Sequence, residues 1–482
     1  MSSLGLLYAH EGRRTVSERK VLVVGIDGGT WDVLGPYMES GVMPRLGRIA
    51  AGGSRGVLKS VIPPLTAPAW VSFATGVNPG RHGCFDFITM RSFGDFRPIN
   101  AGDIKVKTFY EALAENGYRC VLINLPVTYP PRIEGVVVTS LLTMGDDFVN
   151  PPELLKEVPA LGDYKIMPSG LYPLVESRFP HDIDLIIENE QRRFEAGKAL
   201  FERDWDFFFI LFSGSDWVQH RAFTEILTGC GPKAQGARSY FALLDEWVGW
   251  FFDHAPEGSL KMVVSDHGFR RLKGVFPVNA WLEKHGFLTF VEGEPDRGLL
   301  SKAQEEVIGP STGPEVPVGF AAKMRDLLEE SRATRWAVPL ARKALIRSPD
   351  FIRSRFVSGY RPDFENSRAF YHFFGFYVRE EGRERTVNEL KRLLEEMNER
   401  SRLYRALARP EDVYWGPHLA GSPSLIVIDP EYASSASRKS AALQECGGQS
   451  HSKDGILVLS GPGVPHGREI SGSLLDICPT VL

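Results

Sequence analysis

A run of apolar residues that ends in an acid, at positions 20–27, most constrains the fold of this chain. Continuous apolar runs of this length are typical of a strand that is buried on both faces of a parallel sheet. Similar runs occur at residues 120–123, 206–212, 261–264, 425–428 and 455–459, and helical patterns lie between them at 107–116, 240–252 and 386–400. Strands that alternate with helices predict an α/β fold: a doubly wound, mostly parallel sheet flanked by helices.

Two regions interrupt this alternation. Residues from about 141 to 200 and from about 290 to 360 are richer in proline, charge and irregular spacing, and we expect inserted cap segments there. Residues 1–18 are expected to form a flexible tail, which leaves 19–482 as one domain with these insertions. Residues 474–482 are expected to begin a helix for which no stop signal follows, as in an incomplete chain.

Composition excludes several classes of protein. The 482 residues carry a net charge of -4, which leaves no basic stripe of the kind that indicates a nucleic-acid partner. Five widely spaced cysteines without a CxxC pair indicate neither a disulfide framework nor a cysteine zinc site. The N-terminus lacks a signal-peptide core, and no stretch approaches the roughly 18 apolar residues of a membrane span. We therefore expect a cytoplasmic protein with reduced thiols.

Acids and histidines follow the predicted strands. In open parallel sheets, ligands bind beyond the carboxyl ends of the strands, so residues at those ends are candidates for a site. Such residues occur after three strands and just before a fourth: Asp27, Asp216 with His220, Asp266 with His267, and His451.

Each of these features also has a structural explanation. Asp27 could cap a helix, and Asp216 with His220 could be an exposed helical pair. Asp266 with His267 could belong to a turn, and His451 could be solvated. Their joint occurrence at predicted strand ends favours a metal site. Mixed carboxylate and imidazole ligands suit zinc best, with manganese as the alternative, because calcium and magnesium prefer oxygen ligands alone.

Thr66 is the candidate nucleophile. It follows Pro63 and Pro64, and it precedes a predicted short helix with Pro68 in the first turn. A hydroxyl there lies beside backbone N–H groups and the positive end of the helix dipole, which suits a phosphate, although a plain N-cap threonine has the same pattern. Coordination to a metal would favour the alkoxide and so activate the hydroxyl.

Taken in order along the chain, these motifs resemble those of the alkaline phosphatase superfamily, in its type I phosphodiesterase/nucleotide pyrophosphatase branch. The matching pieces are Asp27-Gly28, Met43-Pro44, Thr66-Ala67-Pro68, Thr75-Gly76, Asn78-Pro79-Gly80-Arg81-His82-Gly83, Asp216 with His220, Ser265-Asp266-His267-Gly268 and His451 with Asp454-Gly455. The resemblance implies two divalent metal ions, expected to be zinc. It assigns one ion to Asp27, Thr66, Asp266 and His267, and the other to Asp216, His220 and His451. We expect a structural role for His82.

The resemblance implies a two-metal phosphohydrolase of small-molecule phosphoesters. Thr66 would attack phosphorus to form a phospho-threonine, which water would then hydrolyse. Family members carry an asparagine at the position of Ala69, which is followed here by Trp70. A small and an aromatic side chain suit an organic substituent, so diesters are expected to outrun monoesters. Arg81 and Lys453 are the cations that could bind the extra charge of a monoester.

Four other functions stay open on the sequence. A metal-dependent phosphomutase shares the metal ligands, but such enzymes usually use serine and a large insertion after it. A phosphomonoesterase is possible on the same scaffold. A transferase that passes a phosphoryl group to a lipid or sugar is weakened by the lack of a membrane segment. A non-catalytic binding protein would be expected to have lost ligands, and all seven are present.

Overall fold

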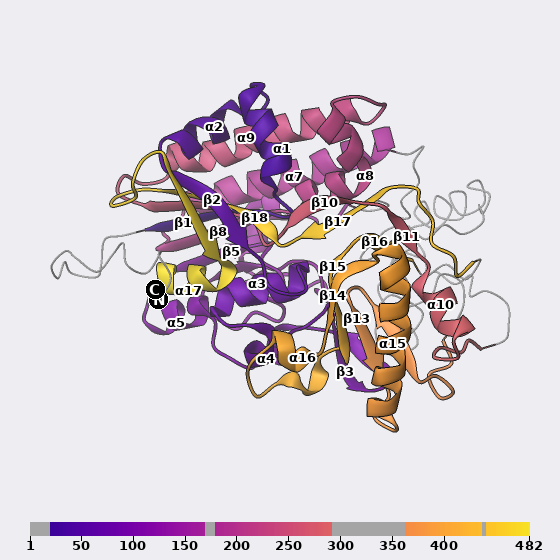
Figure 1. Cartoon of the computed structure of the whole chain (residues 1–482). Helices are drawn as coiled ribbons and strands as arrows, with labels where there is room; N and C mark the ends of the chain where they lie inside the picture. The colour runs from indigo at the N-terminus through magenta and orange to yellow at the C-terminus, as the bar shows by residue number, and fades with distance from the viewer. Residues whose placement is uncertain (1–19, 169–178, 292–361, 436–439) are drawn as a thin grey trace, which may run out of the picture.

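A nine-stranded sheet forms the centre of the larger lobe in the computed structural model, which describes residues 20–168, 179–291, 362–435 and 440–482 (Figure 1). From one edge to the other the strands are β19 (Arg468–Ser473), β2 (Ser54–Lys59), β18 (Asp454–Ser460), β9 (Leu260–Val264), β1 (Val21–Ile26), β8 (Phe207–Phe212), β5 (Cys120–Ile123), β6 (Val136–Val138) and β7 (Val149–Asn150). The central strands β9, β1, β8, β5 and β6 are parallel, whereas β18 runs antiparallel to both β9 and β2. The predicted mostly parallel sheet is confirmed.

Helices cover both faces of this sheet (Figure 1). The upper layer contains α1 (Trp31–Glu39), α2 (Pro44–Ala51), α7 (Phe179–Phe201), α8 (Gly214–Thr228) and α9 (Ala234–His254); the lower layer contains α3 (Thr66–Thr75), α5 (Phe109–Glu115) and α17 (Ile477–Val481). Alternate residues of β1 serve the two layers: Leu22 and Val24 belong to the upper core, and Val23 belongs to the lower core. Strand residues that are apolar on both faces therefore produce the doubly wound fold.

A second, smaller sheet lies beside the larger lobe. Its antiparallel strands are β12 (Ala369–His372), β13 (Gly375–Val378), β15 (Leu425–Pro430) and β14 (Tyr404–Ala408), and α15 (Arg383–Ser401) and α10 (Val278–Lys284) pack in the same core. The apolar run at 425–428 was predicted to lie in the parallel sheet, and this prediction is wrong. β15 is an inner strand of the second sheet, where burial by both neighbours and α15 produces the same apolar pattern.

The structure describes only part of the two regions where insertions were predicted. The second half of the 141–200 region is α7, whose residues Ile186 and Leu200 are fully buried in the upper core, so it is part of the helical layer. Nearly all of the 290–360 region lies outside the described residues, as does the predicted tail. The expected C-terminal helix is present as α17, which packs against α3 through Ile477 and Cys478. Within the described ranges, no helix combines the length and the apolar character of a membrane span.

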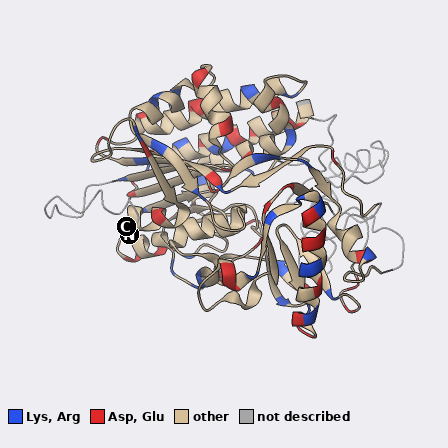
Figure 2. Ribbon diagram, viewed as in Figure 1, with Lys and Arg blue, Asp and Glu red and all other residues tan. Residues whose placement is uncertain are grey.

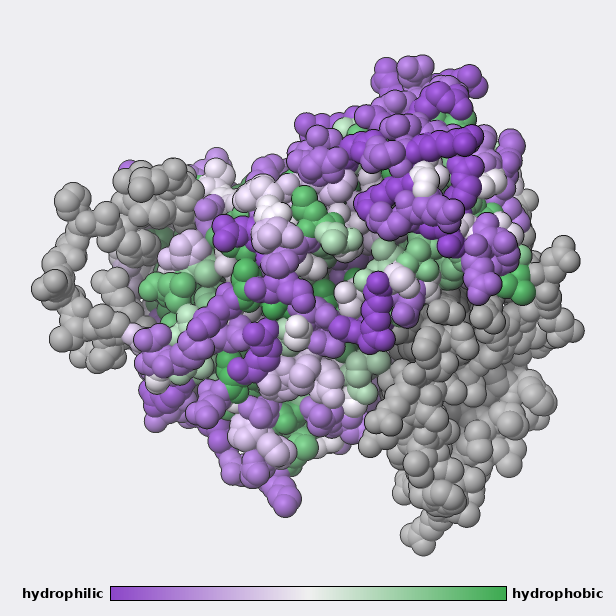
Figure 3. Space-filling model, turned by 90° about the horizontal axis from the view of Figure 1, so that it is seen from below, coloured by the Kyte–Doolittle hydropathy of each residue, from purple (hydrophilic) through white to green (hydrophobic). Residues whose placement is uncertain are grey.

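The described surface is mixed in charge and polarity. Figure 2 shows basic and acidic residues close together along α15, and there Lys391 Nζ lies 3.8 Å from Glu395 Oε1 and Arg392 Nη1 lies 2.6 Å from Glu396 Oε1. In the view from below, small hydrophobic patches lie between hydrophilic residues (Figure 3). This distribution is that of an ordinary globular surface.

Candidate metal centre

The carboxyl edge of the large sheet gathers the predicted site residues. Asp27 follows β1 directly, and Asp216 and His220 lie in the first two turns of α8, which follows β8. Asp266 and His267 connect β9 to β10 (Gly268–Leu272). Because β1, β8 and β9 are parallel neighbours, their ends bring these acids and histidines together.

His451 reaches this edge by a different route. It lies on β17 (Gly448–Ser452), which pairs with β10 in antiparallel register so that His451 stands opposite Phe269. The next strand, β18, runs antiparallel to β9, so the start of β18 lies at the edge where β9 ends. His451, which precedes β18, therefore lies at the same edge of the sheet as the residues that follow β1, β8 and β9.

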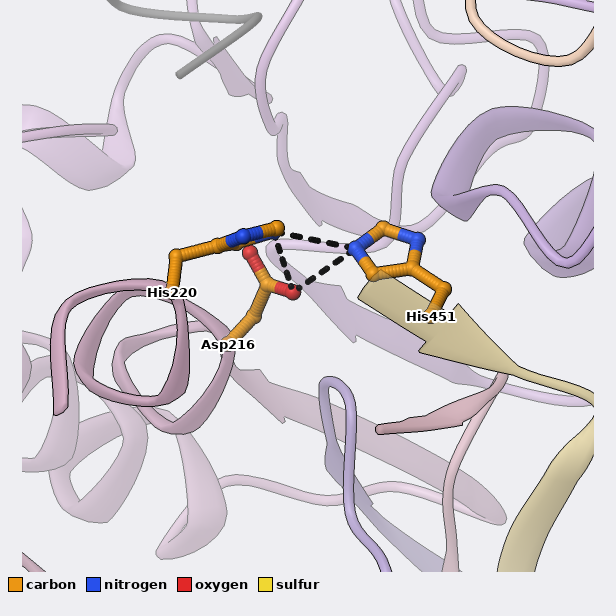
Figure 4. Close-up of side chains that lie close together, drawn as sticks. All are labelled: Asp216, His220 and His451. Carbon is orange, nitrogen blue, oxygen red and sulfur yellow. Dashed lines mark hydrogen bonds and ion pairs between the residues drawn. The ribbon is translucent and has the colours of Figure 1, made fainter. Parts of the chain in front are cut away.

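Asp216, His220 and His451 point toward one another (Figure 4). The Nε2 atoms of the two histidines are 3.0 Å apart, and Oδ1 of Asp216 lies 3.4 Å from His220 Nε2 and 3.3 Å from His451 Nε2. His451 Nδ1 donates a hydrogen bond of 2.9 Å to the Pro64 carbonyl oxygen, which orients the ring and leaves Nε2 as the atom that faces the group.

A second group forms around His267 Nε2. This atom lies 3.2 Å from Asp266 Oδ2, 3.6 Å from Asp27 Oδ1 and 3.4 Å from Thr66 Oγ1. The rings of His267 and His451 stack with centroids 3.7 Å apart, so the two groups are adjacent. Asp216 also lies within reach of a cation shared by Asp27 and His267, which places its carboxylate between the two groups.

Burial makes this collection of charges unfavourable without a cation. Desolvation and the nearby carboxylates raise the pKa of Asp27 well above its ordinary range, and burial raises the pKa of Asp266 to about 7. Burial also opposes ionisation of Asp216, but His220 and His451 hold its pKa well below the usual value. Burial together with His451 lowers the pKa of His267, which keeps its imidazole neutral.

The donor set fits metal ions. Within the described part of the chain, Asp27 Oδ1, Asp216 Oδ1 and Asp266 Oδ2 are buried and have no hydrogen-bond partner. A buried carboxylate oxygen without a partner is costly, and a divalent cation would offset that cost. Neutral imidazole nitrogens and carboxylate oxygens together are the ligands that zinc and manganese accept.

Thr66 is the first residue of α3, and it is 6% exposed. Its hydroxyl lies against the second group through His267, as given above. The first N–H groups of a helix have no intrahelical partner, so this hydroxyl lies beside free donors and the positive end of the α3 dipole. The sequence predicted that Thr66 precedes a helix; in the structure it is the first helical residue, and Leu65 occupies the N-cap.

Of the three residues proposed from the sequence for substrate binding, Trp70 packs into the core, Arg81 is exposed and Lys453 pairs with an acid. Trp70 is fully buried and packs edge-on against Phe73 and Phe209, with ring centroids 5.2 Å and 5.4 Å away. The predicted aromatic wall is therefore not formed by Trp70, because the lower face of the sheet covers that side of α3. Arg81 is exposed on α4 (Pro79–His82), and Lys453 Nζ lies 3.7 Å from Asp429 Oδ2 in the second sheet.

Two residues of the site were missed on the sequence. Phe269 is buried, and its ring centroid lies 4.9 Å from that of His220 and 5.2 Å from that of His451. Gln219 is buried beside His220 and donates to the Gly28 carbonyl oxygen at 2.8 Å. Each directly adjoins a motif, Phe269 after Asp266-His267-Gly268 and Gln219 before His220. This adjacency was the available indication.

Comparison with known proteins agrees with this geometry. Phosphonoacetate hydrolase from Sinorhizobium meliloti 1021, in complex with phosphonoformate, has a TM-score of 0.55 at 16% identity over 96% of this chain and 95% of that chain. Murine ectonucleotide pyrophosphatase/phosphodiesterase 5 has a TM-score of 0.51 at 13% identity over 96% of this chain and 93% of that chain. At these identities the likeness establishes the fold alone.

No curated protein matches the chain. Residues 21–454 match the family described as type I phosphodiesterase/nucleotide pyrophosphatase, which is nearly the whole of the described fold. The chain therefore belongs to the type I phosphodiesterase/nucleotide pyrophosphatase family of the alkaline phosphatase superfamily, and it is a metal-dependent hydrolase of phosphoric esters.

Proposed function

We propose that this enzyme cleaves phosphodiester bonds in small organic substrates through a phospho-threonine intermediate on Thr66. The observation that carries the proposal is the position of the Thr66 hydroxyl. It lies at the start of α3 and 3.4 Å from His267 Nε2, in the group that adjoins the group of Asp216, His220 and His451. A nucleophile, an anion-binding helix end and two candidate cation sites thus meet at one place.

Seven residues would hold the two ions. Asp27, Thr66, Asp266 and His267 would hold one, and Asp216, His220 and His451 would hold the other. Zinc is proposed because imidazole and carboxylate ligands occur in both groups, and manganese is the alternative. When bound, the ions would supply positive charge that favours the deprotonated hydroxyl and neutralises the phosphoryl oxygens.

The reaction has two displacements at phosphorus. In the first, the Oγ1–P bond of Thr66 forms while the bond from phosphorus to the leaving oxygen breaks, and the leaving group takes up a proton as an alcohol. In the second, a water oxygen attacks phosphorus and the Oγ1–P bond breaks, which releases a phosphomonoester and restores the hydroxyl. The buried setting of Thr66 limits the access of competing water during the first step.

The side chains that flank Thr66 support an organic substituent on phosphorus. Leu65 and Ala67 belong to an apolar cluster with Phe87 and Phe374, and the partly exposed Phe373 packs against it. We call this set the flanking cluster. Phe87 and Phe373 have ring centroids 5.2 Å apart. The aromatic surface expected from Trp70 is thus proposed to come from Phe87 and Phe373.

Backbone strain also concentrates in the flanking cluster. Six non-glycine residues have a positive φ in the described ranges, and three of them, Val127, Leu142 and Phe373, belong to or pack against this cluster. Left-handed backbone is costly for β-branched and bulky residues, and such strain gathers at functional sites. Lys453, the cation that could have favoured a monoester dianion, pairs instead with Asp429.

Thr66→Ala tests the covalent mechanism. The variant should fold as the wild type does, because only a methyl and a hydroxyl are lost, and the six remaining ligands should still bind metal. Turnover of bis-(4-nitrophenyl) phosphate should fall by at least about 10³-fold, since no side chain replaces the nucleophile. Thr66→Ser should retain partial activity and, after acid quench, should carry a 4-nitrophenyl phosphoryl group on the side-chain hydroxyl at position 66, detectable by mass spectrometry. Near-normal rates in Thr66→Ala would mean that water attacks directly.

The diester preference is tested separately. Metal-reconstituted wild type should show a higher kcat/KM for bis-(4-nitrophenyl) phosphate than for 4-nitrophenyl phosphate. A higher value for the monoester would contradict the proposed substrate class without affecting the role of Thr66.

A further inference from the structure

The two candidate cation sites lie on different elements, so the distance between them depends on how those elements are held together. Asp27 belongs to the turn after β1, whereas Asp216 and His220 belong to α8. Two ions that act on one phosphoryl group must lie roughly 3.5–4 Å apart. A small shift of α8 relative to the β1 turn would change that spacing.

Two hydrogen bonds tie α8 to the turn that carries Asp27. Ser215 Oγ donates to the Asp27 carbonyl oxygen at 2.5 Å, and Gln219 Nε2 donates to the Gly28 carbonyl oxygen at 2.8 Å. Ser215 is fully buried and Gln219 is 1% exposed. They stand four residues apart on α8, in the positions just before Asp216 and His220. Ser215 and Gln219 therefore bind the Asp27 turn from one side of α8. The residues that follow each of them, Asp216 and His220, are candidate ligands.

Gly28 is held on its other side as well. Its N–H donates to Asp266 Oδ1 at 3.2 Å, so the Gly28 peptide connects α8 to the loop after β9. Gly28 has a φ of 66°, and a Cβ there would lie 2.6 Å from Phe269 and 3.3 Å from Asp216 Oδ1. The Gly28 backbone thus lies close to both Asp266 and Asp216, one from each group of candidate ligands.

Gln219 occupies this position at a cost. Its Nε2 also donates to the Ser215 carbonyl oxygen at 3.1 Å, and two carbonyl acceptors fix the orientation of the amide. Its Oε1 is buried and makes no hydrogen bond within the described structure. A buried acceptor without a partner destabilises the fold, and an apolar side chain of the same shape would avoid that loss. If the side chain at position 219 only filled space, methionine or leucine would stabilise the fold more than glutamine does.

We propose that Gln219, assisted by Ser215, is a positioning residue that fixes the Asp27 turn against α8 and thereby sets the spacing of the two cation sites. This inference rests on the proposed two-ion function. Gln219 belongs to neither group of candidate ligands, and its effect passes through the Gly28 carbonyl oxygen. Its loss should loosen the ion held by Asp27, Asp266 and His267 more than the ion held by His451, Asp216 and His220, whose ligands keep their own supports.

The test is a metal titration of the apoprotein without substrate. Wild type, Gln219→Met and Ser215→Ala are titrated with Zn²⁺ by calorimetry and with Co²⁺ by absorption spectroscopy. Wild type should bind two equivalents. Gln219→Met should also bind two, but one dissociation constant should rise about 10–100-fold, as is usual for residues that orient ligands. Ser215→Ala should change the same constant in the same direction, with little loss of volume.

Single-site backgrounds assign the change to one ion. In a His451→Ala background, Gln219→Met should weaken the remaining Co²⁺ site; in an Asp27→Asn background it should leave the remaining site unchanged. Gln191→Met is the matched control, because Gln191 accepts a 3.2 Å hydrogen bond from Trp247 inside the helical layer. That variant should bind both ions as the wild type does.

Two results would overturn the inference. One is a pair of variants, Gln219→Met and Ser215→Ala, that bind both ions with wild-type affinity. The other is an equal loss at both sites, which would indicate general loosening of the fold. A wild type that binds two ions but hydrolyses no phosphoester would refute the proposed function and leave this inference intact, because the titration contains no substrate.

Discussion

At the scale of single residues, His82 shows how a histidine near the site is kept out of its chemistry. It is fully buried on α4, where its Nε2 lies 2.8 Å from Ser72 Oγ and its Nδ1 accepts from the Cys84 N–H at 3.1 Å. An acceptor at Nδ1 places the single proton on Nε2. Burial lowers the pKa of His82 to about 3, so the ring is neutral at physiological pH. The contacts agree with the structural role expected from the sequence.

This burial predicts an acid sensitivity. His82 has a folded-state pKa of about 3, and its unfolded-state value is near 6.5. The unfolded chain therefore takes up a proton that the folded chain refuses, so this contribution to stability is complete above pH 6.5 and declines as pH falls toward 3. Between pH 7 and pH 5, wild-type apoprotein should lose about 2 kcal/mol more unfolding free energy than His82→Gln, measured by urea denaturation. Parallel losses in the two proteins would contradict the assignment.

The flanking cluster gives a second prediction at this scale. Phe373→Ala should raise KM for bis-(4-nitrophenyl) phosphate about tenfold with a smaller change in kcat, because an aromatic contact to the organic group is lost. Phe93→Ala is the control, since Phe93 is a partly buried aromatic residue that packs in the second-sheet core. Steady-state kinetics of the two variants measure KM and kcat for comparison with the wild type. An unchanged KM in a folded Phe373→Ala protein would place the organic group elsewhere.

The sequence was sufficient to predict which residues lie at the site where this depended only on their position after a strand. Asp27 and Asp266 follow buried strands, and parallel strands must end at one edge. Trp70 could not be placed in this way. Its neighbourhood depends on which side of α3 faces the sheet, and all ten residues of α3 are buried, so the helix has no polar stripe to indicate its orientation.

At the scale of elements, the ladder of β10 and β17 holds His451 in position. Five residue pairs join these strands, and Phe269 stands opposite His451. Side chains alternate between the two faces of a strand, so a shift by one residue moves His451 to the other face.

One inserted residue tests this ladder. A glycine inserted between Ser450 and His451 should reduce binding to one equivalent of Co²⁺ and remove activity, because the imidazole leaves the Asp216 group. A glycine inserted between Cys446 and Gly447, both exposed and just before β17, should be absorbed by the loop. Retention of both equivalents after the first insertion would show that the ladder does not set the position of His451.

The direction of strands was less predictable than their presence. The apolar patterns located β1, β8, β9 and β18, but such a pattern is the same for parallel and antiparallel neighbours. The antiparallel course of β18 explains how His451 reaches the site, and the placement of β15 in a second sheet depends on pairing with β13 and β14. Pairing between distant segments is not encoded in the local pattern.

At the scale of the whole molecule, the cation sites connect the central sheet, the upper helical layer and the start of α3. We expect chelation to lower Tm by roughly 10 °C, since two bound ions stabilise the fold by mass action. The increase in Tm on adding Zn²⁺ to the apoprotein should be larger at pH 8 than at pH 6. Without a cation the pKa of Asp266 is about 7, so at pH 6 its proton competes with the ion, whereas at pH 8 the ion relieves a buried charge.

Differential scanning fluorimetry of apoprotein and zinc-loaded protein at the two pH values measures this difference. Asp454→Ala is a suitable control, because Asp454 forms an exposed pair with Lys59 outside the two ligand groups. It should show the same zinc response as the wild type. An equal gain at pH 6 and pH 8 would contradict the coupling between protonation of the carboxylates and metal binding.

The position of His451 on β17 also has a consequence for synthesis of the chain. His451 follows His220 by 231 positions, and the second sheet is encoded between them. A ribosome that adds about 5–20 residues per second delivers His451 roughly 10–50 s after His220. The large sheet can gather its strands through β9 during that interval, but the group of Asp216, His220 and His451 cannot exist before it ends. A nascent chain therefore carries its buried carboxylates without their last ligand until the second lobe has left the ribosome.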